Sequence, residues 1–134
     1  MRDFRPIINI LGLLLCIESV ALLIPMFFDL INHNQDWKQF FVISCLTFLI
    51  GLVLYVGFKK ENIKINLRQA FLLTIVSWFL IAFFGCLPFI YTSSSLNFTD
   101  SFFETVSGIT TTGSTVIPNL DILSEGILVW RSLL

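Results

Sequence analysis

Three long apolar runs dominate the sequence and limit what it can fold into. They extend over residues 7–31, 40–58 and 70–91, and the second and third contain no charged residue. About 20 residues of α-helix cross the ~30 Å hydrocarbon core of a bilayer, so each run is long enough to span it. Because backbone groups in lipid need internal hydrogen-bond partners, we expect helices rather than open strands. The sequence therefore predicts an all-α integral membrane protein with three transmembrane helices.

The composition excludes a soluble globule. Charged residues make up 13% of the chain and hydrophobic residues 56%, whereas a soluble domain carries about 25% charged residues. The formal net charge of −1 provides no basic field for nucleic acid, so we expect membrane lipid and no nucleic acid among the partners.

The basic residues predict the orientation in the membrane. Six of the eight precede the first run or separate the second from the third: Arg2, Arg5, Lys59, Lys60, Lys64 and Arg68. The link at residues 32–39 carries only Lys38, which Asp36 offsets. By the positive-inside rule, the N-terminus and the 59–69 loop are expected in the cytoplasm, and the segment after residue 91 outside.

Prolines and one carboxyl stand out within the runs. Pro25 and Pro88 lie late in the first and third runs and are expected to bend their helices. Glu18 is the ionisable group at mid-membrane depth, and an intramembrane carboxyl is a functional candidate by default. We interpret Glu18 as a protonated structural group that makes one interhelical hydrogen bond.

A short helix is predicted after the third run. Its apolar stripe consists of Phe102, Phe103, Val106 and Ile109. Two N-terminal signals compete: Thr99 as N-cap with Asp100 in the first turn, or a capping box formed by Ser101 and Glu104. Either way the helix has about ten residues, so at roughly 15 Å it can enter a bilayer halfway but cannot cross it.

The residues after this helix predict a pore loop. Thr110, Thr111, Thr112 and Gly113 are followed by Ser114 and Thr115. Non-helical backbone at membrane depth survives only where protein surrounds it or where it lines an aqueous cavity. The negative end of a half-helix favours a cation there, and backbone carbonyls can replace the water shell of K⁺. Gly113 suits such a filter because glycine accepts backbone angles barred to other residues.

The order of residues closely resembles the first pore loop of the Trk/Ktr/HKT superfamily, specifically the bacterial TrkH type. The resemblance rests on residues 99–104 and 107–115 and extends over essentially the whole chain. It includes the start at residues 11–14 and the Leu-Pro-Phe at 87–89. Residues 127–133 look like the entry to the next pore-lining helix.

The resemblance implies a function and a domain organisation. The family carries K⁺ inward through four span–pore helix–span repeats in one polypeptide, often after two extra spans. On that pattern, residues 1–58 are the accessory pair, 59–69 the cytoplasmic basic loop, and 70–134 the first repeat with a truncated second span. The chain would thus hold three transmembrane helices, a re-entrant pore helix with its filter loop, and the start of a fourth span.

The resemblance also implies ligands and partners. K⁺ is the one metal expected, coordinated by the backbone carbonyls of Thr110, Thr111, Thr112 and Gly113. Glycine at position 113 is similar to the K⁺-selective members, whereas a serine there goes with Na⁺-permeable plant relatives. The bacterial transporters of this type lie in the cytoplasmic (inner) membrane, form homodimers and are regulated by a cytosolic nucleotide-binding ring.

Two other functional classes compete with a potassium transporter. With one Thr-Thr-Thr-Gly element, the chain is expected to be an N-terminal fragment that does not conduct alone. The alternative is a small multispan interaction or assembly subunit without transport activity. An enzyme is not expected, because His33 is the one histidine, and Asp100 and Glu104 are better dipole partners of a helix N-terminus than an acid–base pair.

Overall fold

The computed structural model describes residues 4–59, 65–118 and 120–134, and all regular structure within them is helical. Three helical segments are long and apolar enough to cross a membrane: Arg5–Ile31, Trp37–Gly57 and Leu67–Tyr91. The three predicted spans are therefore confirmed, with their ends shifted by a few residues. Of the predicted basic loop at 59–69, residues 60–64 lie outside the described residues, as does Arg2.

The first and third spans are interrupted near Pro25 and Pro88, where bends were predicted. The first consists of α1 (Arg5–Ala21) and α2 (Leu23–Ile31), and the third of α4 (Leu67–Gly85) and α5 (Leu87–Tyr91). Proline has no N–H for the carbonyl four residues earlier, and its ring clashes with that carbonyl. The helices accordingly break at Leu22 and Cys86, shortly before Pro25 and Pro88.

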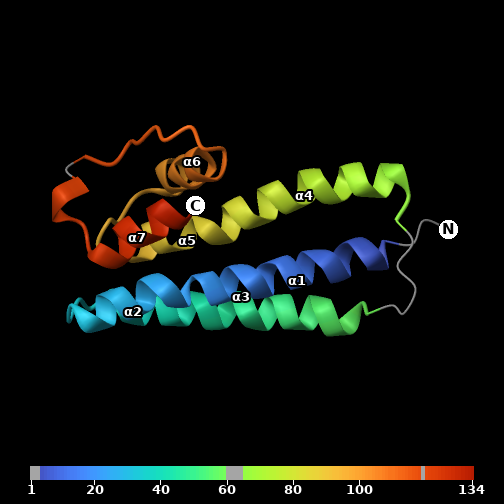
Figure 1. Cartoon of the computed structure of the whole chain (residues 1–134), viewed down its shortest axis with the longest axis horizontal. Helices are drawn as coiled ribbons and strands as arrows, with labels where there is room; N and C mark the ends of the chain where they lie inside the picture. The colour runs from blue at the N-terminus through green and yellow to red at the C-terminus, as the bar shows by residue number, and fades with distance from the viewer. Residues whose placement is uncertain (1–3, 60–64, 119) are drawn as a thin grey trace.

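The first two spans form an antiparallel pair. α1 and α2 lie alongside α3 (Trp37–Gly57), as Figure 1 shows. Glycines allow this close approach: a Cβ on Gly12 would lie 2.5 Å from Tyr55 N, and one on Gly51 would lie 2.9 Å from Cys16 N. Small residues at a helix–helix contact let two backbones come together in this way.

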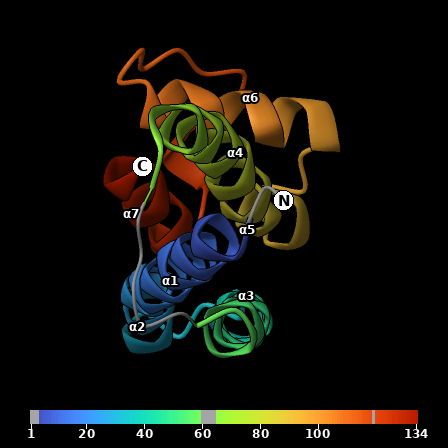
Figure 2. The ribbon, with the colours of Figure 1, turned by 90° about the vertical axis from the view of Figure 1, so that its right-hand side faces the viewer.

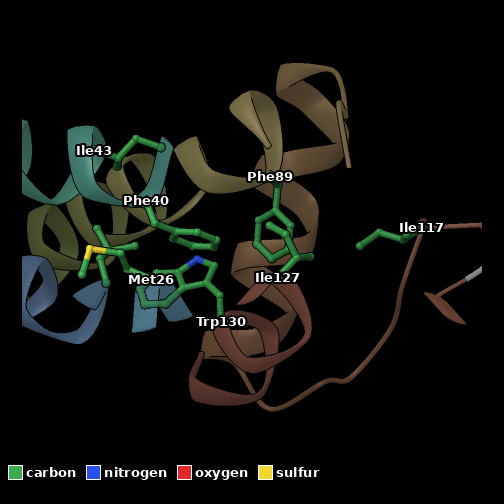
Figure 3. Close-up of a cluster of buried hydrophobic side chains, with 8 residues drawn as sticks. Met26, Phe40, Ile43, Phe89, Ile117, Ile127 and Trp130 are labelled. Carbon is green, nitrogen blue, oxygen red and sulfur yellow. The ribbon is translucent and has the colours of Figure 1, made fainter. Parts of the chain in front are cut away.

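A hydrophobic cluster joins this pair to the rest of the chain. Its buried members are Leu22, Met26, Phe40, Ile43, Phe89, Ile117, Ile127 and Trp130. They come from the break between α1 and α2, from α2, α3, α5 and α7 (Glu125–Leu133), and from the segment before α7. Figure 3 shows the Trp130 indole beside Phe40 and Met26. Close packing of these side chains links the first pair of spans to α5 and α7, because each buried side chain makes many small van der Waals contacts.

The remaining short helix lies across the long ones. α6 (Phe98–Ile109) is seen nearly end-on in Figure 1 and lengthwise in Figure 2, where α1 and α4 are end-on. After α6 the chain runs to the end of the molecule where the 3-10 turn η1 (Leu120–Ile122) lies, and α7 then returns beneath α6. The Trp130 Nε1–H on α7 donates to Gly85 O at 2.9 Å, which ties α7 to the end of α4.

Candidate functional site

α6 begins earlier than the sequence predicted. Its N-cap is Asn97, whose side chain accepts from the Asp100 N–H at 2.9 Å, so Asp100 lies in the first turn. Thr99 is therefore inside the helix, and the predicted caps at Thr99 and at Ser101 are corrected. Asparagine is among the strongest N-cap residues, and it lies three residues before the N–H that it accepts from.

Glu104 does not form the predicted capping box. Its side chain is 1% exposed and faces the segment that follows the threonines. One oxygen accepts from the Thr115 hydroxyl at 2.5 Å and from the Val116 N–H at 2.6 Å. The other accepts from Arg131 Nε on α7 at 3.2 Å. Glu104 therefore ties α6 to α7 and to the intervening loop.

Residues 110–113, the threonine segment, fold back onto the C-terminus of α6 through their backbone N–H groups. Thr110 N donates to Val106 O and Thr111 N to Gly108 O, both at 2.9 Å. The N–H groups of Thr112 and Gly113 both donate to Ser107 O, at 3.0 and 3.3 Å. These bonds satisfy carbonyls that the end of a helix otherwise leaves open.

The carbonyl oxygens of the same segment are left available. Within the described ranges no donor reaches the carbonyls of Thr110, Thr111 or Thr112, and all three residues are exposed. The N–H groups of the segment therefore donate to α6, while its threonine carbonyl oxygens stay unpaired. Such oxygens are the ligand type that suits a dehydrated alkali cation.

Two residues of the segment have left-handed backbone angles. Thr111 has φ 57° and Gly113 has φ 72°. A positive φ is an outlier for a β-branched residue such as threonine, and such strain gathers at functional sites. Nothing lies within 4 Å of where a Gly113 Cβ would be, so the backbone angle rather than space calls for glycine there.

The sequence analysis missed two residues that hold this segment. Ser107 Oγ donates to Ser114 O at 2.7 Å, and Arg131 Nη2 lies 3.5 Å from Gly113 O. Both line a cleft of ≈ 460 Å³ between α6 and α7, together with Glu104 and Thr111. The available signal was charge: an arginine and a glutamate in apolar helices each need a partner, because buried charges are rarely left unpaired.

The interhelical hydrogen bond predicted for Glu18 is not found among the described residues. Its side chain is 7% exposed, and neither carboxylate oxygen has a hydrogen-bond partner in the described part of the chain. A Cβ on Gly85 would lie 3.2 Å from Glu18 Oε1 and 2.9 Å from the Thr105 methyl. The Thr105 hydroxyl donates to Ser101 O instead. The neighbours of Glu18 therefore offer it no donor.

A third buried carboxylate, Asp29 on α2, binds the start of α7. It accepts from the Gly126 N–H at 2.8 Å, from the Ser124 hydroxyl at 3.4 Å and from the Asn34 amide at 3.3 Å. A negative charge suits the N-terminal end of a helix. Nowhere in the described residues, including those around Asp29, does a group of three or more His, Cys, Asp or Glu side chains gather where it could hold a metal ion.

Comparison with known proteins finds similarity to cation transport proteins. Residues 36–134 match the TrkH family model, whose description is a cation transport protein. The Trk system potassium uptake protein TrkH of Escherichia coli K12 is 36% identical over 132 residues, which cover 98% of this chain and 27% of that protein. An uncharacterized cation transporter of Methanocaldococcus jannaschii is 28% identical over 131 residues, with 98% and 27% covered.

A solved structure shares the fold. The crystal structure of the potassium transporter TrkH from Vibrio parahaemolyticus superposes with a TM-score of 0.90 at 33% identity and covers 97% of this chain. That match takes in 28% of the transporter. The chain thus spans about a quarter of the length of the relatives that it matches.

Proposed function

Because the chain belongs to the TrkH family of cation transport proteins, we propose that it is the N-terminal part of a channel-like potassium uptake transporter and supplies one filter segment of its pore. Its three spans make it a multi-pass membrane protein. The relatives named as potassium uptake proteins support K⁺ as the transported ion. The family description, cation transport, also fits a protein that is not an enzyme.

In this proposal α6 is a re-entrant pore helix and residues 110–113 are the filter. α6 has 12 residues, about 18 Å at 1.5 Å per residue, which is too short to cross a bilayer. One observation carries the proposal. The backbone N–H groups of residues 110–113 donate to carbonyls of α6, whereas the carbonyl oxygens of the three threonines accept from no donor within the described residues.

The chemistry is coordination without covalent steps. A K⁺ ion that enters the filter exchanges water for carbonyl oxygens, and the negative end of α6 adds a favourable field. One chain segment supplies ligands on one side of the ion. The remaining ligands come from further repeats of the same transporter, which lie on the exposed face of residues 110–116.

The whole chain can be assigned to the parts of a transporter of this family. We assign residues 1–58 to an accessory pair of spans, 59–69 to the cytoplasmic loop, and 70–134 to the first repeat, with α7 as the start of its second span. Arg5, Lys59 and Arg68 support a cytoplasmic N-terminus, because the start of α1, the end of α3 and the start of α4 lie at one end of the molecule (Figure 1). The proposed setting is the bacterial inner membrane, with a homodimer and a cytosolic nucleotide-binding ring as partners.

Gly113→Ser in the full-length transporter tests the filter. A serine at φ 72° is strained by about 1–3 kcal/mol, so the carbonyls should shift. We expect K⁺-over-Na⁺ selectivity to fall about tenfold, since 1.4 kcal/mol corresponds to one factor of ten. The measurement is the ratio of K⁺ to Na⁺ uptake in cells that lack other K⁺ uptake systems.

Gly57→Ser is the matched control. Gly57 is the last residue of α3, and nothing lies within 4 Å of where its Cβ would be. We expect it to leave the selectivity ratio unchanged. If Gly113→Ser also leaves the ratio unchanged at normal abundance, the filter assignment is wrong, and the assembly-subunit alternative becomes the better one.

A further inference from the structure

Two opposite charges from α6 and α7 meet beside the proposed filter. Glu104 is 1% exposed and Arg131 26% exposed, and Arg131 Nε lies 3.2 Å from Glu104 Oε2. The proposed function assigns neither of them a role. Taking a carboxylate and a guanidinium out of water is costly, so a pair at this depth needs compensating contacts.

The contacts of Glu104 are concentrated on the backbone that leaves the filter. Its Oε1 accepts from both the Thr115 hydroxyl and the Val116 N–H. The Thr115 hydroxyl oxygen in turn accepts from the Ile117 N–H at 3.1 Å. The carboxylate therefore fixes residues 115–117 relative to α6, immediately after Gly113 and Ser114.

Arg131 reaches the filter from the other side. While its Nε binds Glu104, its Nη2 lies 3.5 Å from the Gly113 carbonyl oxygen. The planar fork of a guanidinium allows two such contacts at fixed spacing, which a lysine ammonium does not reproduce. An uncompensated positive charge at this distance would repel a K⁺ ion held by the same carbonyl, and Glu104 cancels that charge.

We propose that Glu104 and Arg131 are a positioning pair: together they fix the Gly113 carbonyl and the exit of the filter, and their charges cancel so that the pair does not repel K⁺. This inference rests on the proposed function, because it concerns the geometry of the same filter. Both residues act through the backbone that they hold and through the balance of their two charges.

A mutant cycle in the full-length transporter tests the pair. Glu104→Gln keeps the size of the side chain but leaves the Arg131 charge uncompensated. We expect the K⁺ concentration for half-maximal uptake to rise about tenfold, on the scale of losing one hydrogen bond between charged groups. The double variant Glu104→Gln with Arg131→Gln removes both charges. It should recover most of the K⁺ affinity while K⁺-over-Na⁺ selectivity stays low, because the anchor is lost.

Arg131→Lys keeps the charge and the pairing with Glu104 but cannot make both contacts at once. It should lower selectivity with little change in abundance, so it decides the question if Glu104→Gln fails to assemble. Glu125→Gln is the control, because Glu125 lies at the start of the same helix and binds Asn32 rather than the loop. We expect it to leave both half-saturation and selectivity unchanged.

Two outcomes overturn the proposal. Unchanged half-saturation and selectivity in Glu104→Gln and Arg131→Lys would show that the pair is a structural contact only, even if abundance falls. A double variant with no better K⁺ affinity than Glu104→Gln would show that the charges do not compensate. If Gly113→Ser alters selectivity but the pair variants do not, this inference fails and the proposed function stands; if Gly113→Ser has no effect, the proposed function itself fails.

Discussion

Three of the buried carboxylates, Asp29, Asp36 and Glu104, connect separate parts of this chain. Asp29 joins α2 to the start of α7, and Asp36, after α2, accepts from the Ser93 N–H at 3.0 Å in the link between α5 and α6. Glu104 joins α6 to α7. Each lies at a place where a backbone N–H or a cation faces it, which offsets the cost of removing a charge from water.

Asp29→Ala should weaken the contact between α2 and α7. The change removes the acceptor for the buried Gly126 N–H, and leaving such a donor unpaired costs about 1–3 kcal/mol. We expect a lower free energy of unfolding, measured by thermal or denaturant titration of the purified transporter. Asp100→Ala is the comparison, because Asp100 contacts its neighbour Asn97; equal losses in the two variants would contradict the role given to Asp29.

At the scale of elements, close backbone contact holds the first pair of spans together. α1 and α3 meet at Gly12 and Gly51, and the Asn9 amide donates to Tyr55 O at 2.6 Å across the same interface. Lipid tails are as apolar as leucine, so helices in a membrane associate through such packing and hydrogen bonds rather than through the hydrophobic effect.

Gly51→Ala should separate these two helices. The added Cβ would lie 2.9 Å from both Cys16 N and Gly12 O, and backbone atoms cannot move aside cheaply. Overpacking of this kind costs about 1–3 kcal/mol. The measurement is the unfolding free energy of the transporter in detergent, beside Gly57→Ala, where the new Cβ meets nothing within 4 Å. Equal stability of the two variants would show that the interface relaxes around a methyl group.

At the scale of the whole molecule, the proposed function requires other protein segments to complete the filter. Residues 110–116 are all exposed, and their carbonyls can surround an ion only when other segments complete the ring. Large apolar side chains such as Leu49, Phe71 and Phe79 are also exposed along α3 and α4, which fits lipid or neighbouring repeats.

The proposed function predicts a native polypeptide that is much larger than this chain. We expect the intact mass of the protein from its own membranes to be several times 15.3 kDa. The reason is that this chain matches only about a quarter of the length of its relatives. A native mass near 15.3 kDa would favour an assembly of several chains or the interaction-subunit alternative.

The sequence alone determined the spans, their interruptions and the family. Runs of apolar residues must be helical in lipid, and a proline removes a fixed hydrogen bond wherever it lies, so both can be inferred from local order. The Thr-Thr-Thr-Gly element and the residues around it were sufficient to indicate a TrkH-type chain, which the family match over residues 36–134 confirms.

Only the tertiary structure decided how the polar groups pair. Which N–H faces Asp29, what Glu104 binds, and that Glu18 finds no partner among the described residues all depend on contacts between helices far apart in sequence. The N-cap of α6 also differed from the prediction, because several residues near its start can cap and small differences in free energy select among them. Hydrogen bonds are short and directional, so their partners follow from packing, whereas the ability of an apolar run to span a membrane follows from its length and composition.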